Sequence, residues 1–80
     1  MIKSIHHPAY IALIQLLIDE RHRQGLTVRE LASLLEEDAS FITKVETRVR
    51  KLSAIEYFQY CHVLGIDPAR GIELFWSQCS

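Results

Sequence analysis

The residue types that could hold a metal ion or attack a substrate are few and widely spaced in this chain. Its 80 residues include two cysteines, Cys61 and Cys79, which belong to no CxxC pair. Their spacing predicts neither a zinc site nor a disulfide framework. No metal-ligand spacing, such as a histidine pair at i and i+4 with a third ligand downstream, connects the four histidines, which are His6, His7, His22 and His62. We therefore assign no metal-binding residue.

Signatures of catalysis and of cofactor binding are missing as well. The sequence has no Gly-x-Ser-x-Gly, no glycine-rich phosphate loop and three glycines in all. A helical chain of this length offers little room for a substrate pocket. We expect no enzymatic activity, no catalytic residue and no cofactor.

Length and composition predict one globular domain over residues 1–80. No apolar run approaches the roughly 20 residues that span a bilayer, and the N-terminus lacks the pattern of a signal peptide. These features predict a cytoplasmic protein that does not contact membranes. The formal net charge of −1 taken alone argues against nucleic-acid binding, because such domains are commonly basic.

Residues that start and stop helices predict five helices and no strand. Pro8 suits a first helical turn, and Gly25 and Gly65 suit helix ends. Two capping boxes begin at Thr27 and Ser53, each with a glutamate three residues later. The predicted segments are 8–24, 27–35, 39–47 with Asp38 as N-cap, 53–64, and a last helix from Asp67-Pro68 onward.

Apolar residues recur at helical spacing in each segment. The fourth helix carries Ile55, Phe58, Cys61, His62 and Leu64.

Segments 27–35 and 39–47 are the most informative part of the chain. Two short helices joined by a three-residue turn, the second amphipathic, indicate a helix-turn-helix. Ala32 is small where the two helices would cross, and Leu31, Leu35, Ile42 and Val45 would fix the crossing angle.

The run GLTVRELASLLEEDASFITKVETRVRKLSAIEYFQYCHVLGIDP resembles the phage-repressor, or XRE-like, helix-turn-helix family, with likeness over about residues 8–68. The resemblance implies an all-α, five-helix, lambda-repressor-like domain with the helix-turn-helix at helices 2 and 3. It also implies an ion pair between Arg21 and Glu46, and a bacterial, phage or plasmid origin.

The resemblance further implies recognition of double-stranded DNA by a transcriptional regulator, with the third helix in the major groove. Base-reading positions would be Ala39, Ser40, Thr43 and Lys44. Phosphate-binding positions would be Thr27, Arg29, Thr47, Arg48, Arg50 and Lys51.

Residues 66–80 carry more apolar side chains than a capping helix needs, which predicts a homodimer. The interface would contain Ile66, Ile72, Phe75 and Trp76. Alternatively, Phe75 and Trp76 fold back onto the first helix.

Several positions depart from the family pattern. Val28 and Ala39 stand where many members carry glutamine, and Glu36 and Arg48 stand where they carry glycine, so both would need a positive φ. Acidic residues fill the turn: Glu36, Glu37 and Asp38. An alternative function is therefore a protein-interaction module with weak or no DNA binding, and a protein partner in place of DNA.

Charge is unevenly distributed along the helix-turn-helix. Residues 41–52 carry a local charge of +3 and residues 28–40 one of −3. The net charge of the chain therefore does not exclude DNA binding, although it predicts weak non-specific affinity and a shallow salt dependence.

Overall fold

The structure is a computed structural model that describes residues 7–79, apart from the side chain of Cys79. His6 lies outside the described residues. Within that range five helices and no strand are found: α1 (Pro8–Arg23), α2 (Val28–Leu34), α3 (Ala39–Glu46), α4 (Ala54–Leu64) and α5 (Pro68–Cys79). The predicted all-α fold is confirmed. The first three helices each end one residue earlier than predicted, because Gln24, Leu35 and Thr47 are C-caps.

The helix starts follow from local side-chain hydrogen bonds. Both predicted capping boxes are present, at Thr27 with Glu30 and at Ser53 with Glu56. Asp38 is the N-cap of α3, but its side chain makes no capping hydrogen bond. Stabilisation of α3 by Asp38 is therefore limited to the favourable position of its charge at the helix N-terminus.

Four helix ends close through a residue in the left-handed conformation. Gly25 and Gly65 have φ of 69° and 70°, and Glu36 and Arg48 have φ of 56° and 60°. Each end satisfies its last carbonyl groups in the same way; the amide of Glu37, for example, donates to the carbonyl of Ala32 at 2.9 Å. The two departures from glycine therefore keep the backbone geometry of the family and carry the strain of a Cβ atom at positive φ.

Replacing Arg48 with glycine should raise the free energy of unfolding by about 0.5–1 kcal/mol, because the strain removed exceeds the chain entropy that glycine adds. Urea denaturation measures this change. Arg48→Ala is the control, since it removes the same charge but keeps a Cβ at positive φ. A glycine variant no more stable than the alanine variant would contradict the assignment of strain.

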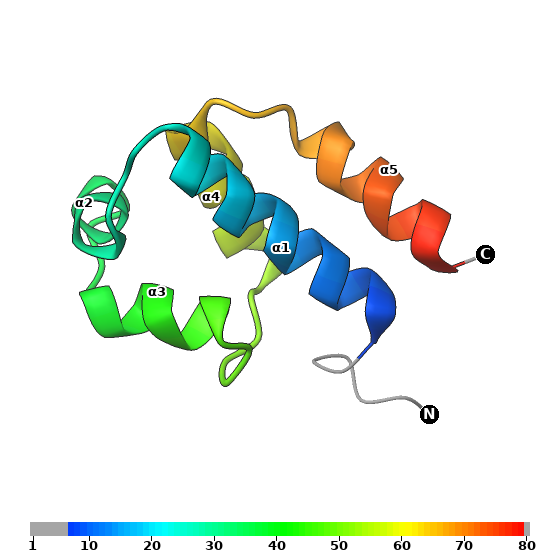
Figure 1. Ribbon diagram of the computed structural model, residues 1–80, viewed down its shortest axis with the longest axis horizontal. Helices are drawn as coiled ribbons and strands as arrows, with labels where there is room; N and C mark the ends of the chain where they lie inside the picture. Colours follow the sequence, from blue (N-terminus) through cyan, green and yellow to red (C-terminus); the bar gives the residue numbers. More distant parts are fainter. Residues whose placement is uncertain (1–6, 80) are drawn as a thin grey trace.

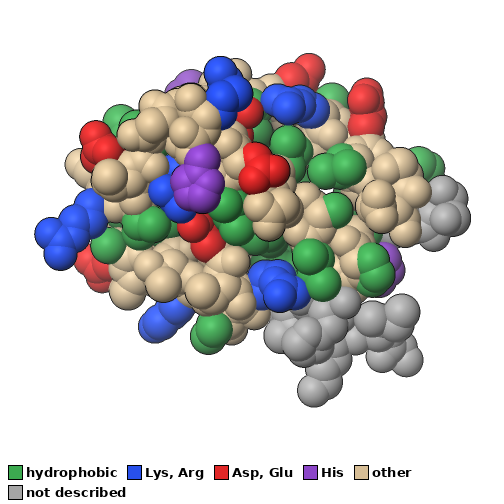
Figure 2. Space-filling model, in the orientation of Figure 1, with side chains coloured by type: hydrophobic (Ala, Val, Ile, Leu, Met, Phe, Trp, Pro, Cys, Tyr) green, Lys and Arg blue, Asp and Glu red, His purple; other side chains and the backbone are tan. Residues whose placement is uncertain are grey.

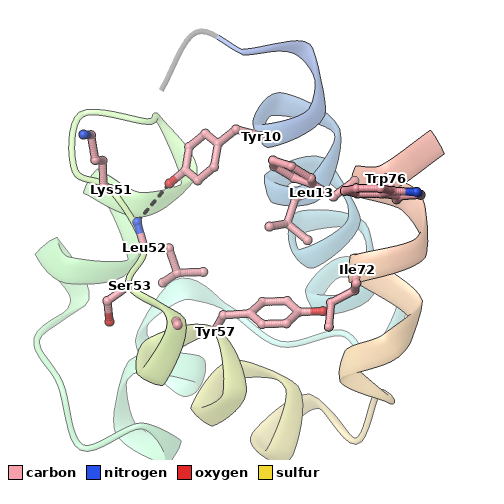
Figure 3. A pocket seen from close by; sticks show the side chains of 11 residues that line it. Tyr10, Leu13, Lys51, Leu52, Ser53, Tyr57, Ile72 and Trp76 are labelled. Carbon is pink, nitrogen blue, oxygen red and sulfur yellow. Dashed lines mark hydrogen bonds between the residues drawn. The ribbon is translucent and has the colours of Figure 1, made fainter. Parts of the chain in front are cut away.

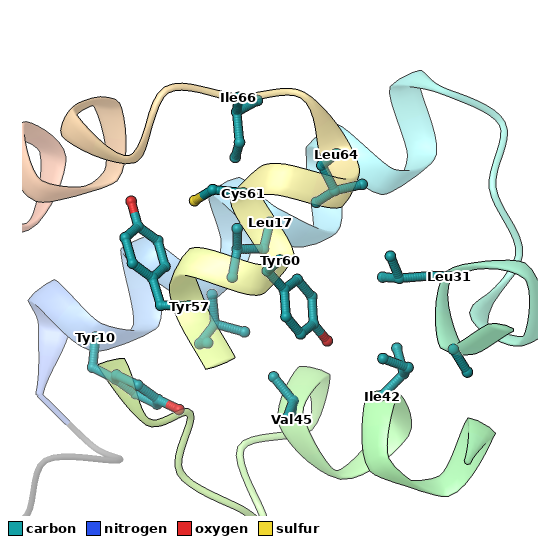
Figure 4. Close-up of a cluster of buried hydrophobic side chains, with 12 residues drawn as sticks. Tyr10, Leu17, Leu31, Ile42, Val45, Tyr57, Tyr60, Cys61, Leu64 and Ile66 are labelled. Carbon is teal, nitrogen blue, oxygen red and sulfur yellow. The ribbon is translucent and has the colours of Figure 1, made fainter. Parts of the chain in front are cut away.

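One hydrophobic core is shared by the first four helices (Figure 4). Its largest fully buried side chains are Ile14, Leu17, Leu31, Ile42, Val45, Tyr60 and Cys61. The residues noted in the fourth helix are divided between its two faces. Tyr57, Tyr60, Cys61 and Leu64 face the core, whereas Ile55, Phe58 and His62 are exposed. Both faces of α4 carry apolar residues, so periodicity alone could not identify the buried one.

Helix α5 lies alongside α1 (Figure 1). Gly71 permits this approach, because a Cβ there would collide with the hydroxyl oxygen of Tyr57 and with Cδ1 of Leu13. The Tyr57 hydroxyl also donates to the carbonyl of Pro68 at 2.5 Å, at the start of α5. In the described part of the chain, no helix is long and apolar enough to cross a membrane.

Candidate nucleic-acid interface

The outer face of α3 is open to solvent. Ile42 and Val45 anchor the helix in the core, which leaves Ser40, Thr43 and Lys44 exposed on the other side. Ala39, the fourth predicted base-reading residue, is half-buried and packs against the core. The structure therefore brings three of the four predicted residues together on one accessible surface.

The position of α3 is held by the Arg21–Glu46 pair. Nε and Nη2 of Arg21 donate to the two carboxylate oxygens of Glu46 at 2.7 and 2.9 Å, and Nη1 donates to the carbonyl of Leu26 at 2.8 Å. Only 10% and 13% of the two side chains are exposed. This pair joins α1, the α1–α2 turn and the end of α3, and its geometry suits a structural role.

Three threonines lie at the predicted interface, and their hydroxyls differ in what they can offer a phosphate. Thr27 Oγ1 accepts from the amide of Glu30 at 3.1 Å, so its proton remains available to donate. Thr43 and Thr47 instead donate to main-chain carbonyls one turn earlier, at 3.2 and 2.8 Å. Since a phosphate only accepts, these two hydroxyls would have to rotate before binding it.

Arg50, predicted to bind phosphate, is already held by other groups. Its guanidinium donates two hydrogen bonds of 2.8 Å to Glu56 and lies 4.7 Å from the ring centroid of Phe41. The hydrogen bond from Arg50 lowers the pKa of Glu56 to about 2. Arg50 thus joins the α3–α4 connector, residues 47–53, to α3 and α4.

Pairing changes which cations are available beside α3. Glu46 is neutralised by Arg21, and Arg50 by Glu56. Among the described residues of the helix-turn-helix and the connector, the cations without an ion pair are therefore Arg29, Lys44, Arg48 and Lys51. On the face seen in Figure 2, basic and acidic side chains are interspersed rather than gathered into one patch of a single sign.

Tyr10 is a site residue that sequence reasoning missed. Its hydroxyl accepts a hydrogen bond from the amide of Leu52 at 3.0 Å and so ties the connector to α1. The two residues are 42 positions apart, and no local signal links them. No local signal links Phe41 to Arg50 either, although the ring of Phe41 lies beneath the guanidinium. The sequence identified Glu56 only as part of a capping box, which does not reveal that its carboxylate also pairs with Arg50.

The four predicted dimer residues occupy three different environments. Ile66 is 8% exposed and belongs to the core, so it cannot form part of an interface. Phe75 is half-buried, and its ring stacks on that of His7 with 6.0 Å between centroids. Ile72 and Trp76 are 54% and 74% exposed. Folding back onto α1 therefore applies to Phe75 and leaves Trp76 open to solvent.

Ile72 and Trp76 border an apolar groove of about 400 Å³ between α1, the connector and α5 (Figure 3). We call this the α5 groove. Other residues along it include Tyr10, Leu13, Leu52 and Tyr57. Because the connector forms one wall, the groove lies beside the segment that carries Arg48 and Lys51.

The acidic turn, residues 36–38, is exposed at the N-terminal end of α3. Glu36, Glu37 and Asp38 are all solvent-accessible, and none forms an ion pair within residues 7–79. The acidic run therefore places three carboxyl groups without an ion pair next to the N-terminus of α3.

A short α2, a turn and an α3 with an open outer face together define a helix-turn-helix domain. This architecture is shared with an XRE-family like protein from Pseudomonas syringae pv. tomato str. DC3000, which is 34% identical, with a TM-score of 0.84 over 96% of this chain and 94% of that chain. The chain belongs to the XRE family of helix-turn-helix proteins.

A second solved structure supports the fold alone. The clp gene regulator ClgR from C. glutamicum is 24% identical, with a TM-score of 0.75 over 90% of this chain and 94% of that chain. No family model and no curated protein matches the sequence.

Proposed function

We propose that this protein is a sequence-specific regulator of transcription that binds double-stranded DNA. The observation that carries the proposal is the open face of α3, with Ser40, Thr43 and Lys44, flanked by the unpaired cations Arg48 and Lys51. Membership of the XRE family supports it. The protein would act as a repressor by covering a promoter.

Helix α3 would enter the major groove, which is about 12 Å wide and shows a distinct pattern of donors and acceptors for each base pair. Lys44 would donate to guanine O6 or N7, and Ser40 and Thr43 would contact bases or phosphates. DNA phosphates would be bound by donors on both sides of α3, from the side chains of Thr27, Arg29, Arg48 and Lys51. The proposed activity is DNA binding, with no chemical step.

Selection of bound duplexes from a random library at moderate salt tests this function. We expect enrichment of a pseudo-palindromic site. Lys44→Ala should change the preferred bases, whereas Arg48→Ala or Lys51→Ala should weaken binding to all sequences and reduce the salt slope by about one each. Arg50→Ala should reduce the slope less, because Glu56 already neutralises that guanidinium. Failure to enrich any site would contradict the proposal.

We also propose that the protein binds DNA as a homodimer. One α3 contacts few base pairs, and two-fold related domains bind half-sites about 34 Å apart. The α5 groove supports this arrangement, because exposed Trp76 borders an apolar cavity large enough to receive an indole ring from a second copy. A contact there would bring the two connectors toward the two-fold axis.

Trp76→Asp should convert a dimer into a monomer of 9.3 kDa and weaken DNA binding at the same time. Sedimentation at micromolar concentration gives the mass. Ile55→Asp is the matched control, since Ile55 is 72% exposed against 74% for Trp76 but lies away from the α5 groove. A wild-type protein that sediments as a clean monomer would exclude this dimer.

The alternative function is a protein-interaction module with little affinity for DNA. The exposed, unpaired carboxylates of Glu36, Glu37 and Asp38 favour it, because they would repel phosphates within a Debye length. A duplex library that yields no enriched site, from a protein that still folds, is the result expected of this alternative. For either function we propose a cytoplasmic protein encoded by a bacterium, a phage or a plasmid, since the 34% identical protein comes from Pseudomonas syringae.

A further inference from the structure

Helix α4 has a second face that the core does not use. Ile55, Phe58, Gln59 and His62 follow one another at i, i+3, i+4 and i+7, which places them on one side of the helix. Ile55 is 72% exposed and Phe58 is 52% exposed. Two large apolar side chains that lie exposed beside Gln59 and His62 suit this outer face to a contact with another molecule.

The outer face of α4 forms one wall of a groove of about 430 Å³ that is lined by five apolar residues and by Glu36, Gln59 and His62. The opposite wall is the end of α2 and the turn after it, with Leu34, Leu35 and Glu36. Leu34 is 54% exposed, so three large apolar side chains from two helices lie open along the same groove. We call it the α2–α4 groove. It shares no residue with α3 or with the α5 groove.

The charge at the α2–α4 groove is negative. Glu36 lines it, Glu37 and Asp38 follow directly, and no lysine or arginine lies along its walls. His62 is the other titratable residue in the lining. Glu36 keeps φ at 56°, where glycine would be less strained, and its carboxylate forms no ion pair among the described residues. The rim of the groove therefore presents the carboxyl groups of Glu36, Glu37 and Asp38, none of which forms an ion pair among the described residues.

This charge pattern excludes two kinds of occupant. A duplex would bring phosphates against Glu36 and Glu37, which is unfavourable. A second copy related by a two-fold axis would place the same acidic rim against itself, because such interfaces pair one patch with its own copy. The occupant that fits is apolar along its centre and positively charged at its edge.

We propose that the α2–α4 groove binds a cationic amphipathic helix of a partner protein. Apolar side chains at i, i+3 or i+4 of that helix would pack between Leu34 and Phe58, and its lysines or arginines would pair with Glu36 and Glu37. The groove shares no residue with α3 or α5. The proposal does not depend on DNA binding, since the groove is formed by one chain alone.

A designed amphipathic peptide of about 18 residues, made of leucine and lysine at helical spacing, is the probe. Titration into the 15N-labelled protein, followed by NMR, should shift the amide signals of residues 34–38 and 55–63. A matched peptide with glutamate in place of lysine should bind at least about tenfold more weakly, because like charges then meet at the rim.

Two variants locate the contact. Phe58→Ser should weaken binding of the leucine–lysine peptide by about tenfold, and Glu36→Gln with Glu37→Gln by about fivefold with loss of most of its salt dependence. Ile11→Ser is the control, because Ile11 is a 38% exposed apolar residue on α1 that lines neither groove, and it should leave the affinity unchanged.

Three results would overturn the proposal. The first is peptide shifts that centre on the α5 groove, and the second is equal affinity for the glutamate peptide. The third is a Phe58→Ser variant that changes the sedimentation mass, since the groove would then be occupied by a second copy. Duplex selection with Phe58→Ser separates this test from that of the proposed function, because the variant should enrich the same DNA site as the wild type.

Discussion

Replacing Arg21 with alanine should lower the free energy of unfolding by about 3–5 kcal/mol, because it leaves the carboxylate of Glu46 buried without its partner. The change also removes the hydrogen bond from Arg21 to the carbonyl of Leu26, which closes the turn between α1 and α2. A domain of this size has a total stability of about 4–12 kcal/mol, so the loss is a large share of it. Urea denaturation followed by circular dichroism measures it.

Arg23→Ala is the matched control for Arg21→Ala. Arg23 also lies in the last turn of α1 and also pairs with a glutamate, Glu20, but its side chain is 67% exposed. Glu20 is itself only 5% exposed, but without Arg23 it keeps Arg70 at 3.7 Å and the side-chain amide of Gln24 at 3.4 Å as partners. We therefore expect a smaller loss than for Arg21→Ala. Equal losses for the two variants would show that leaving Glu46 without its cation has no particular energetic consequence.

A double variant separates the ion pair from the packing around it. Arg21→Ala combined with Glu46→Ala should be less destabilising than the sum of the two single variants, because neither charge then remains buried alone. Arg21→Lys should recover little stability, since lysine cannot form two parallel hydrogen bonds to a carboxylate and reach the Leu26 carbonyl as well.

Replacing Gly71 with alanine should lower the free energy of unfolding by about 1–3 kcal/mol, although alanine favours helix over glycine by about 1 kcal/mol. The added methyl group would collide with Leu13 and with the hydroxyl oxygen of Tyr57, so α5 would have to move away from α1. Thermal unfolding gives the stability, and sedimentation shows whether a displaced α5 also weakens the proposed dimer.

Tyr57→Phe provides the control for Gly71→Ala, because it removes the oxygen atom with which the new methyl group collides. In the Tyr57→Phe background the cost of Gly71→Ala should fall, by an amount that a double-mutant cycle measures. Glu73→Ala, at an exposed position of the same helix, should change stability little. A Gly71→Ala variant more stable than the wild type would mean that α5 accommodates the methyl group without moving.

Much of the secondary structure was predictable because its causes are local. The capping boxes at Thr27 and Ser53 join residues three positions apart. The hydrogen bonds that close the helix ends at Gly25 and Gly65 join residues three to five positions apart. The positive φ of Glu36 and Arg48 was expected from the family pattern, because those positions are commonly glycine. The Arg21–Glu46 contact followed from the same resemblance, since nothing between two residues 25 positions apart predicts their distance.

The candidate interface was predictable only in part. Ser40, Thr43 and Lys44 are exposed as expected, because the opposite face of α3 carries Ile42 and Val45. Arg50 also lies on the expected segment, but its ion pair with Glu56 and its position over Phe41 depend on how the connector folds back onto α3 and α4. Residue type and position could identify cations, although not which of them were already paired.

Local sequence thus decided where the helices begin and end and which face of α3 is buried, because capping bonds and helical periodicity act over a few residues. The packing of the helices decided the rest. It selected Tyr57 and Tyr60 over Ile55 and Phe58 as the buried face of α4, because both faces are apolar and only contacts with other helices distinguish them. It also placed Tyr10 against the connector and Gly71 against Tyr57, since such contacts between distant residues arise only when the core is assembled.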